Sequence, residues 1–243
     1  SMFFFGVAER DSNFSYHSLK KNNSKLVIFK FPSPGALVAH NKYLRTDILA
    51  LCSKYQKEEF YNELHKTIKC KNVIFVKSEF QHNYENLYQN STPKSYNFKL
   101  GFYSHAGWLR KSSGNTNALF AKGTDEEIVL GLINSILKNK NEQLLIFLHP
   151  KEKNELINSE KYYSKILPDI NFKIYDGKLS SSESFDLVEI GVGAYSTILF
   201  ERDNMNRKVI IYRVKDFPIP NTEFYKKSFN NQETLLKCIT KTS

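Results

Sequence analysis

Short apolar runs recur along the chain and alternate with amphipathic segments, which predicts strands alternating with helices. In the first third, apolar runs cover Phe3–Val7, Leu26–Phe31 and Val73–Val76, and runs of this length bounded by polar residues are typical of buried strands. From about Tyr43 to Ile68, apolar residues recur near helical spacing instead, which predicts one long helix. The expected order in this part is therefore strand, strand, helix, strand.

A polar stretch rich in Asn and Gln separates this part from the rest. It runs from Glu79 to Ser95 and contains Ser91-Thr92-Pro93 near its end, a combination that interrupts both helical and strand periodicity. We therefore place a domain boundary there. The prediction is an amino-terminal α/β lobe over residues 1–95 and a second α/β domain over residues 96–243.

The alternation of elements is more regular after this boundary. Thr124 and Glu127 have the spacing of a capping box, and they open an apolar-striped helix that reaches about Leu137. The expected strands are Lys99–Tyr103, Leu144–Leu148, Phe172–Tyr175, Leu187–Ile190 and Val209–Tyr212, and the other expected helices are Lys151–Leu167, Ser196–Arg202 and Gln232–Thr240. Strands alternating with helices imply right-handed crossovers and a parallel sheet with helices on both faces. The predicted fold class is α/β.

Composition narrows the classes of ligand. Lys and Arg number 35 against 25 Asp and Glu, a formal net charge of +10, which favours polyanions, anionic lipid surfaces or phosphorylated small molecules. Lysines alternate with asparagines and form no Arg-rich run, so nucleic acid is not an expected partner. Cys52, Cys70 and Cys238 are widely spaced, which argues for a reducing compartment and against a metal site.

No apolar stretch approaches the roughly 18 residues that a bilayer-spanning helix requires. Phe3–Val7 lacks the basic start and cleavage site of a signal peptide. The expected location is therefore cytoplasmic, and a peripheral position at the inner membrane face stays open.

Ligands of parallel α/β sheets lie beyond the carboxyl ends of the strands, and His149-Pro150 directly follows the strand Leu144–Leu148. Pro150 fits the first turn of the next helix, where its missing N–H is not needed. His149 would then face the crevice, where an imidazole can donate to a phosphate or protonate a leaving group. The alternative is a capping or core histidine.

A second candidate site lies between Asp186 and Arg202. Gly193 and Ala194 would let the backbone approach a ligand, and Ser196 and Thr197 stand at the start of the next helix, where free N–H groups and the helix dipole favour an anion. An ordinary Ser/Thr cap is the alternative. Glu201 lies four residues after Thr197 on the same helix, so its carboxylate can reach a ribose hydroxyl beside a bound phosphate. The alternative is a surface carboxylate.

The segment Gly101 to Arg110, after the first strand of the second domain, is a third candidate. It holds the hydroxyl of Ser104, an imidazole, the single tryptophan, Trp108, and the forked donor Arg110. Together these groups can grip a phosphate or a sugar, with Trp108 as a stacking face. The alternative is a packing tryptophan beside a solvated arginine.

The order of these motifs resembles the carboxyl-terminal domain of GT-B glycosyltransferases. The motifs are HPKE after a strand, then FDLVEIGVGAYSTILFER and the apolar strand VIIY. Bacterial surface-polysaccharide sialyltransferases and Kdo-transferases are similar, and CDP-glycerol polymerases carry a related DYSS-type segment. The resemblance spans about Gly101 to Tyr212 and implies two Rossmann-like lobes, the first small or truncated. Gly193-Ala194-Tyr195 stands where the glycerol polymerases have an Asp before the Tyr, which favours a sugar transferase.

The resemblance also implies roles for individual residues: His149, Ser196 and Thr197 would hold the nucleotide phosphates, and Glu201 would lie near the ribose. From the candidate segments above, we also expect the donor site to include Ser104, Arg110, Pro150, Gly193 and Tyr195. The implied activity is metal-independent transfer of a sugar, of sialic acid or Kdo type, from a CMP-linked donor to a bacterial surface glycan or lipid-linked acceptor. It needs no cofactor besides the nucleotide sugar.

Inverting transfer requires a base that deprotonates the acceptor hydroxyl. Glu9, Asp11 and His17 follow the first strand and are the candidates, with solvated loop residues as the alternative. Two other functions stay open: a non-catalytic GT-B-like module that binds nucleotide or glycan, and an enzyme like the nucleotide-sugar 2-epimerases.

Overall fold

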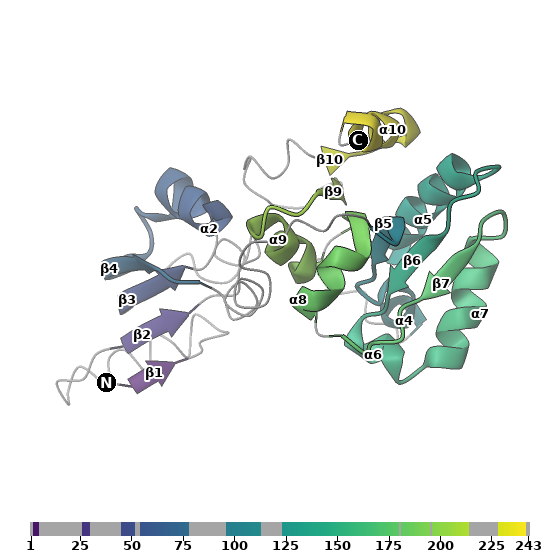
Figure 1. Cartoon of the computed structure of the whole chain (residues 1–243). Coiled ribbons are helices and arrows are strands. Elements are labelled where there is room, and N and C mark those ends of the chain that lie inside the picture. The colour runs from purple at the N-terminus through teal and green to yellow at the C-terminus, as the bar shows by residue number, and fades with distance from the viewer. Residues whose placement is uncertain are drawn as a thin grey trace. The chain divides into compact units, whose positions relative to one another are not determined.

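The computed structural model describes residues 2–4, 26–29, 45–51, 54–77, 96–112, 123–179, 181–194, 196–213 and 228–241 of the 243-residue chain. The chain divides into two compact units (Figure 1). Unit 1 comprises residues 1–82 with 218–224, and unit 2 comprises residues 83–217 with 225–243. The predicted boundary after residue 95 falls at the end of residues 78–95, which lie outside the described residues, and it stays a prediction.

Unit 1 contains a parallel four-stranded sheet in the order β1-β2-β3-β4. Its strands are β1 (Met2–Phe4), β2 (Leu26–Phe29), β3 (Arg45–Leu51) and β4 (Lys69–Phe75). Between β3 and β4 the chain forms α2 (Lys54–Glu59) and then the π-helical turn η1 (Phe60–Leu64).

The long helix predicted over Tyr43–Ile68 is wrong in its first part, because Arg45–Leu51 is strand β3. This strand pairs with β2 on one side and with β4 on the other. Leu49, Ala50 and Leu51 are fully buried, as expected for an inner strand of a parallel sheet, whose apolar run is nearly continuous. Such a run cannot be told from a helix by periodicity alone.

Unit 2 is built on a parallel six-stranded sheet in the order β10-β9-β8-β5-β6-β7. The strands are β5 (Phe98–Tyr103), β6 (Leu144–Phe147), β7 (Phe172–Ile174), β8 (Val188–Gly193), β9 (Val209–Tyr212) and β10 (Ser228–Phe229). The five strands predicted for this part are confirmed, and the two-residue β10 was not predicted. The α/β fold class with parallel sheets is likewise confirmed.

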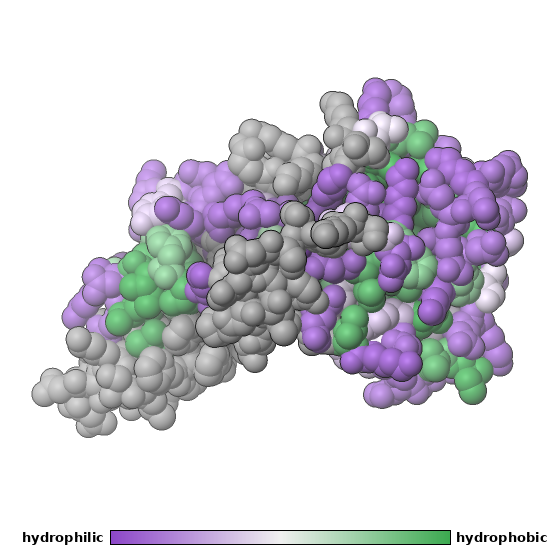
Figure 2. Space-filling view, in the orientation of Figure 1, coloured by the Kyte–Doolittle hydropathy of each residue, from purple (hydrophilic) through white to green (hydrophobic). Residues whose placement is uncertain are grey.

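Helices pack on this sheet and enclose its core. They are α4 (Gly107–Ser112), α5 (Gly123–Leu137), α6 (Pro150–Lys153), α7 (Leu156–Ile166), α8 (Ser181–Ser184), the 3-10 turn η2 (Phe185–Leu187), α9 (Thr197–Asn204) and α10 (Gln232–Lys241). α5 packs against α7 and α10, while α9 packs against β8 and β9. On the face shown in Figure 2, hydrophilic side chains cover most of unit 2. None of the helices in the described ranges is both long and apolar enough to cross a bilayer.

Two helix predictions in unit 2 need correction. The helix expected over Lys151–Leu167 is two helices, α6 and α7, because Glu155 leaves helical geometry with φ −122° and ψ 38°. The helix expected to open at Thr124 begins one residue earlier, at Gly123. The carboxylate of Glu127, the other residue of the expected capping box, accepts from Lys111 Nζ at 3.0 Å.

Candidate functional site

The strand order of unit 2 reverses direction between β5 and β8. From β5 the chain adds β6 and β7 on one side, then returns to add β8, β9 and β10 on the other. In open α/β sheets the ligand crevice lies outside the carboxyl ends of the strands at such a reversal. The segments that leave β5, β6 and β8 therefore form the candidate site, and they carry Ser104, His149 and Ser196.

The segment after β5 closes on a buried glutamate, Glu126. The Glu126 carboxylate is 0% exposed and accepts hydrogen bonds from Ser104 Oγ at 2.8 Å, from the His105 N–H at 3.0 Å and from the Gly107 N–H at 2.6 Å. Ala106, with φ 60°, turns the backbone between these donors. The N-terminus of α4 and the hydroxyl of Ser104 are thus engaged by a carboxylate of the protein itself.

His105 is the residue of this segment that our sequence analysis did not single out. It is 5% exposed, and neither ring nitrogen has a hydrogen-bond partner within the described parts of the chain. Its Nδ1 lies 3.9 Å from Glu126 Oε2. Burial, reinforced by the positive charge of Arg110, lowers the pKa of His105 from 6.5 to about 4, so the imidazole is neutral at pH 7. Its position directly after a predicted strand was the available sequence signal.

At the end of β6, His149 caps helix α6. His149 Nδ1 accepts from the Lys151 N–H at 3.2 Å, and Glu152 Oε2 accepts from the His149 N–H at 2.8 Å, so the two side chains form a capping box. Pro150 occupies the first turn of α6, as predicted. Since Nδ1 is an acceptor, the ring proton of the neutral imidazole resides on Nε2.

The half-buried imidazole of His149 is also uncharged at neutral pH. Burial and then the positive charges of Arg110 and Lys151 lower its pKa to about 4. A neutral ring with its proton on Nε2 is a hydrogen-bond donor but a poor source of a full proton. Of the two roles expected for His149, hydrogen-bond donation suits this neutral ring better than protonation of a leaving group, and both stay predictions.

Trp108 is held inside unit 2 by two contacts. Its indole N–H donates to Glu152 Oε1 at 2.6 Å, and its ring stacks on Tyr162 with centroids 5.3 Å apart and planes 19° apart. Tyr163 donates its hydroxyl to the same Glu152 oxygen at 3.0 Å. Trp108 therefore packs within the unit, and the ligand-stacking role that we considered for it gains no support.

Arg110 lies on α4, one turn after Ala106, whose carbonyl oxygen accepts from the Arg110 N–H at 3.2 Å. Its positive charge lowers the pKa of both His105 and His149. The guanidinium therefore belongs to the same electrostatic group as the two imidazoles.

At the end of β8, Gly193 serves packing within the sheet. A Cβ at this position would lie 2.9 Å from Tyr103 O and 2.9 Å from Leu199 Cδ1. A side chain here would collide with the backbone of β5, so glycine is required by the close approach of β5, β8 and α9. The predicted reason, room for a ligand, is not the one that the structure shows.

Ser196 and Thr197 begin helix α9 as the sequence predicts. Ser196 is the N-cap residue with φ −155° and ψ 135°, and within the part of the chain that the structure describes its side chain makes no capping hydrogen bond. Both residues are half-buried. The anion-binding role expected for their hydroxyls at the start of α9 stays a prediction. Tyr195, and likewise Glu9, Asp11 and His17, lie outside the described residues.

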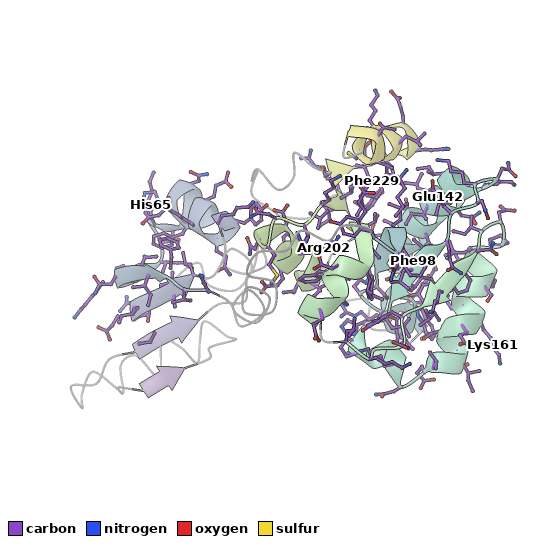
Figure 3. All side chains as sticks on the ribbon, viewed as in Figure 1. His65, Phe98, Glu142, Lys161, Arg202 and Phe229 are labelled. Carbon is purple, nitrogen blue, oxygen red and sulfur yellow. The ribbon has the colours of Figure 1, made fainter. Side chains whose placement is uncertain are left out.

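Behind Ser196 and Thr197, helix α9 presents a buried charged stretch. Glu201 is 1% exposed, which removes the surface-carboxylate alternative; its predicted contact with a ribose stays a prediction. Arg202 is fully buried and donates to the carbonyl oxygens of Phe185, Val188, Glu189 and Lys208. Figure 3 labels Arg202 on α9. The sequence analysis gave this arginine no role.

The candidate residues that the structure describes gather at one edge of the sheet. β6, β5 and β8 are consecutive neighbours, so the segments that carry His149 and Ser196 leave the sheet about 10 Å apart, at roughly 4.8 Å per strand. The segment with His105 leaves it between them. A phosphate ester can span this separation with its phosphate near one segment and its sugar near another.

The fold is of the GT-B type. Over 99% of this chain, at 12% identity and a TM-score of 0.54, it is similar to UDP-N-acetylglucosamine 2-epimerase from Rickettsia bellii, and the match covers 64% of that protein. Sucrose-phosphate synthase from Thermosynechococcus elongatus matches with a TM-score of 0.48 and 9% identity over 98% of this chain and 63% of its own. The chain thus spans less than two thirds of either of these proteins.

A third solved structure, that of E. coli ADP-heptose LPS heptosyltransferase II, matches with a TM-score of 0.38 and 11% identity over 96% of this chain and 80% of its own. Protein-family models give no match to the sequence, and curated proteins give none either. At these identities the likeness shows the fold, and the site has to be argued from the residues of this chain.

Proposed function

We propose that this chain is a metal-independent glycosyltransferase that moves a sugar from a nucleotide donor to a bacterial surface glycan. One observation carries the proposal. Of the helices that follow β5, β6 and β8, α4 has the N–H of its first residue, Gly107, bound by Glu126, and α6 is capped by His149 and Glu152. At α9, by contrast, the Ser196 side chain makes no cap among the described residues, and the proposal places the ligand phosphate there.

In the proposed reaction the leaving group is a nucleotide phosphate, so stabilising its growing negative charge is the main catalytic task. The N-terminus of α9 supplies N–H groups and the positive end of the helix dipole, with the Ser196 and Thr197 hydroxyls beside it. His149 donates from Nε2, and Arg110 supplies a full positive charge. Glu201 would lie near the ribose.

The donor class rests on the motif resemblance, which points to CMP-linked sugars of sialic acid or Kdo type. The acceptor would be a glycan or a lipid-linked glycan, reached from the cytoplasmic side with peripheral contact at the inner membrane. Glu9 and Asp11 remain the proposed candidates for the base, and no cofactor beyond the nucleotide sugar is proposed.

The first experiment measures binding of CMP, CDP, UDP and GDP by calorimetry to the whole chain and to two variants, Ser196→Ala and His149→Ala. Loss of a phosphate hydrogen bond costs about 1.5–3 kcal/mol, so we expect each variant to bind CMP at least tenfold more weakly. His65→Ala, a change of an exposed residue of unit 1, is the matched control. Binding of UDP that neither site variant weakens would overturn the proposal.

A second experiment separates the three functions. Release of CMP from CMP-linked sialic acid or Kdo, with or without acceptor, is expected of a transferase. Nucleotide binding without any donor turnover would identify a non-catalytic module. Conversion of UDP-N-acetylglucosamine to its 2-epimer would identify the epimerase-like alternative.

A further inference from the structure

Two histidines at the ends of neighbouring strands are fixed in the same way. Glu126 accepts from the backbone N–H of His105 at 3.0 Å, and Glu152 accepts from the backbone N–H of His149 at 2.8 Å. Both carboxylates are 0% exposed. The backbone at each histidine is therefore held by a buried acid from a different helix, α5 or α6.

The hydrogen bonds indicate the charge of these acids. Glu126 accepts from a hydroxyl and two N–H groups, and Glu152 accepts from an indole, a phenol hydroxyl and an N–H. If either carboxyl group were protonated, its O–H would face partners that are themselves hydrogen-bond donors. Although burial raises the pKa of both acids, their partners suit the ionised form. Negative charge therefore lies beside the His105 imidazole, whose Nδ1 is 3.9 Å from Glu126 Oε2.

The two imidazoles differ in whether they have room for a second proton. In His149 that proton would have to occupy Nδ1, which already accepts from the Lys151 N–H, so protonation would break the cap of α6. In His105 neither ring nitrogen has a hydrogen-bond partner among the residues that the structure describes, and Nδ1 lies 3.9 Å from Glu126 Oε2. A proton on His105 Nδ1 would meet a carboxylate.

We propose that binding of a phosphate at this edge of the sheet is coupled to the uptake of one proton from solution by His105. His149 stays neutral and donates a hydrogen bond from Nε2. This rests on the function proposed above. An incoming phosphate adds negative charge beside a buried base, and that charge favours the cationic imidazole. By linkage, the proton must then strengthen phosphate binding to the same extent.

The charged groups around the two rings act in both directions. His105 lies 3.9 Å from Glu126 of α5. Asp125 of α5 and Glu152 of α6 favour its protonation, and Arg110 of α4 opposes it. His149 faces Arg110 and Lys151, which oppose protonation, and His105 itself. The negative groups are thus concentrated at His105 and the positive groups at His149, in agreement with the division of roles.

The test measures proton uptake on binding by calorimetry at about pH 6 in buffers of different ionisation enthalpy. The probe is the methyl ester of CMP, whose phosphodiester does not itself titrate near this pH. We expect uptake of between one half and one proton in the wild type and in His65→Gln, and uptake near zero in His105→Gln. His149→Gln should bind more weakly yet retain the uptake.

The outcomes distinguish this inference from the proposed function. Binding of the ester without proton uptake by the wild type overturns the inference and leaves the proposed function standing, whereas no binding of the ester, of CMP or of pyrophosphate overturns both. Should His105→Gln fail to fold, histidine ring NMR of the wild type decides. The pKa of His105 should rise from about 4 by at least about two units in the complex, as an uptake of one half proton or more at pH 6 requires, and an unchanged value contradicts the inference.

Discussion

The backbone N–H of Gly107 donates to the carboxylate of Glu126 at 2.6 Å, across 19 positions of the sequence. Through this bond a side chain of α5 occupies the N-terminus of α4, which follows the first strand of the unit 2 sheet. The place where an α/β sheet of this strand order often receives a ligand phosphate is therefore filled by the protein itself.

Glu126→Gln should destabilise unit 2 strongly. The amide retains one acceptor oxygen, but its NH₂ group would face N–H and hydroxyl donors in a buried site. Breaking such a network typically costs about 3 kcal/mol. Urea unfolding followed by the fluorescence of the single tryptophan, Trp108, measures the loss.

Glu127→Gln is the matched control for this change. Glu127 is the next residue of the same helix, and its carboxylate pairs with Lys111 at a largely exposed position. Exposed pairs of this kind contribute at most about 1 kcal/mol. Equal losses in the two variants would contradict the role given to Glu126.

Gly193→Ala should destabilise unit 2 by about 1–3 kcal/mol, the usual range for overpacking a close contact. The added Cβ would lie 2.9 Å from the carbonyl oxygen of Tyr103, and strand backbone cannot move aside as a flexible side chain would. Gly131→Ala is the control, since a Cβ there meets nothing within 4 Å. In a helix interior this control should stabilise by up to about 1 kcal/mol. Thermal unfolding of both variants tests the prediction, and a neutral Gly193→Ala would refute it.

Arg202→Lys should cost about 3 kcal/mol despite conserving the charge. The guanidinium donates to four backbone carbonyls, and an ammonium group on a shorter, unforked side chain cannot reach all of them. Buried acceptors would then lose their donors. Lys138→Arg, at an exposed ion pair with Asp169, should change stability by less than about 0.5 kcal/mol. A tolerated Arg202→Lys would show that the four bonds are replaceable.

Lowering the pH should reduce the folding stability of unit 2, because His105 becomes protonated. Its pKa is lowered in the folded chain, from 6.5 to about 4, so its neutral form contributes stability above about pH 6.5 that is lost as the pH falls toward 4. The full difference corresponds to about 3 kcal/mol. Glu126 and Glu152 act in the opposite sense, because their pKa values are raised.

The comparison of wild type with His105→Gln isolates the histidine from these acids. The difference in unfolding free energy between the two proteins should shrink between about pH 6.5 and about pH 4. A difference that is constant over this interval would show that the burial of His105 does not govern the acid response.

Much of unit 2 was predictable because its strands are short apolar runs bounded by polar residues. All residues of Leu144–Phe147 and all of Val209–Tyr212 except Tyr212 are buried. Both segments consist of apolar and aromatic residues alone. β3 was missed because Ile48 and Leu51 also fit helical spacing, and the pairing that decides the matter comes from strands elsewhere in the chain.

The candidate site was predictable where function follows from position along a strand. His149, Pro150, Ser196 and Thr197 could be placed at helix starts from the sequence alone. The acids that hold the segments after β5 and β6 could not, because Glu126 and Glu152 reach partners up to 44 positions away, and a glutamate in an amphipathic helix normally indicates a solvated face. Arg202 was missed for the same reason: its carbonyl partners are defined only by the folded backbone.

Arg202 affects how the carboxyl end of the unit 2 sheet responds to a change of pH. A guanidinium keeps its charge at every pH that a folded protein tolerates, so the bonds that join α9 to the chain on either side of it do not titrate. The two segments that carry histidines depend instead on an acid and a base with displaced pKa values. Acidification is therefore expected to loosen the β5 and β6 loops while the α9 side of the crevice remains in place, and hydrogen exchange should reveal this asymmetry.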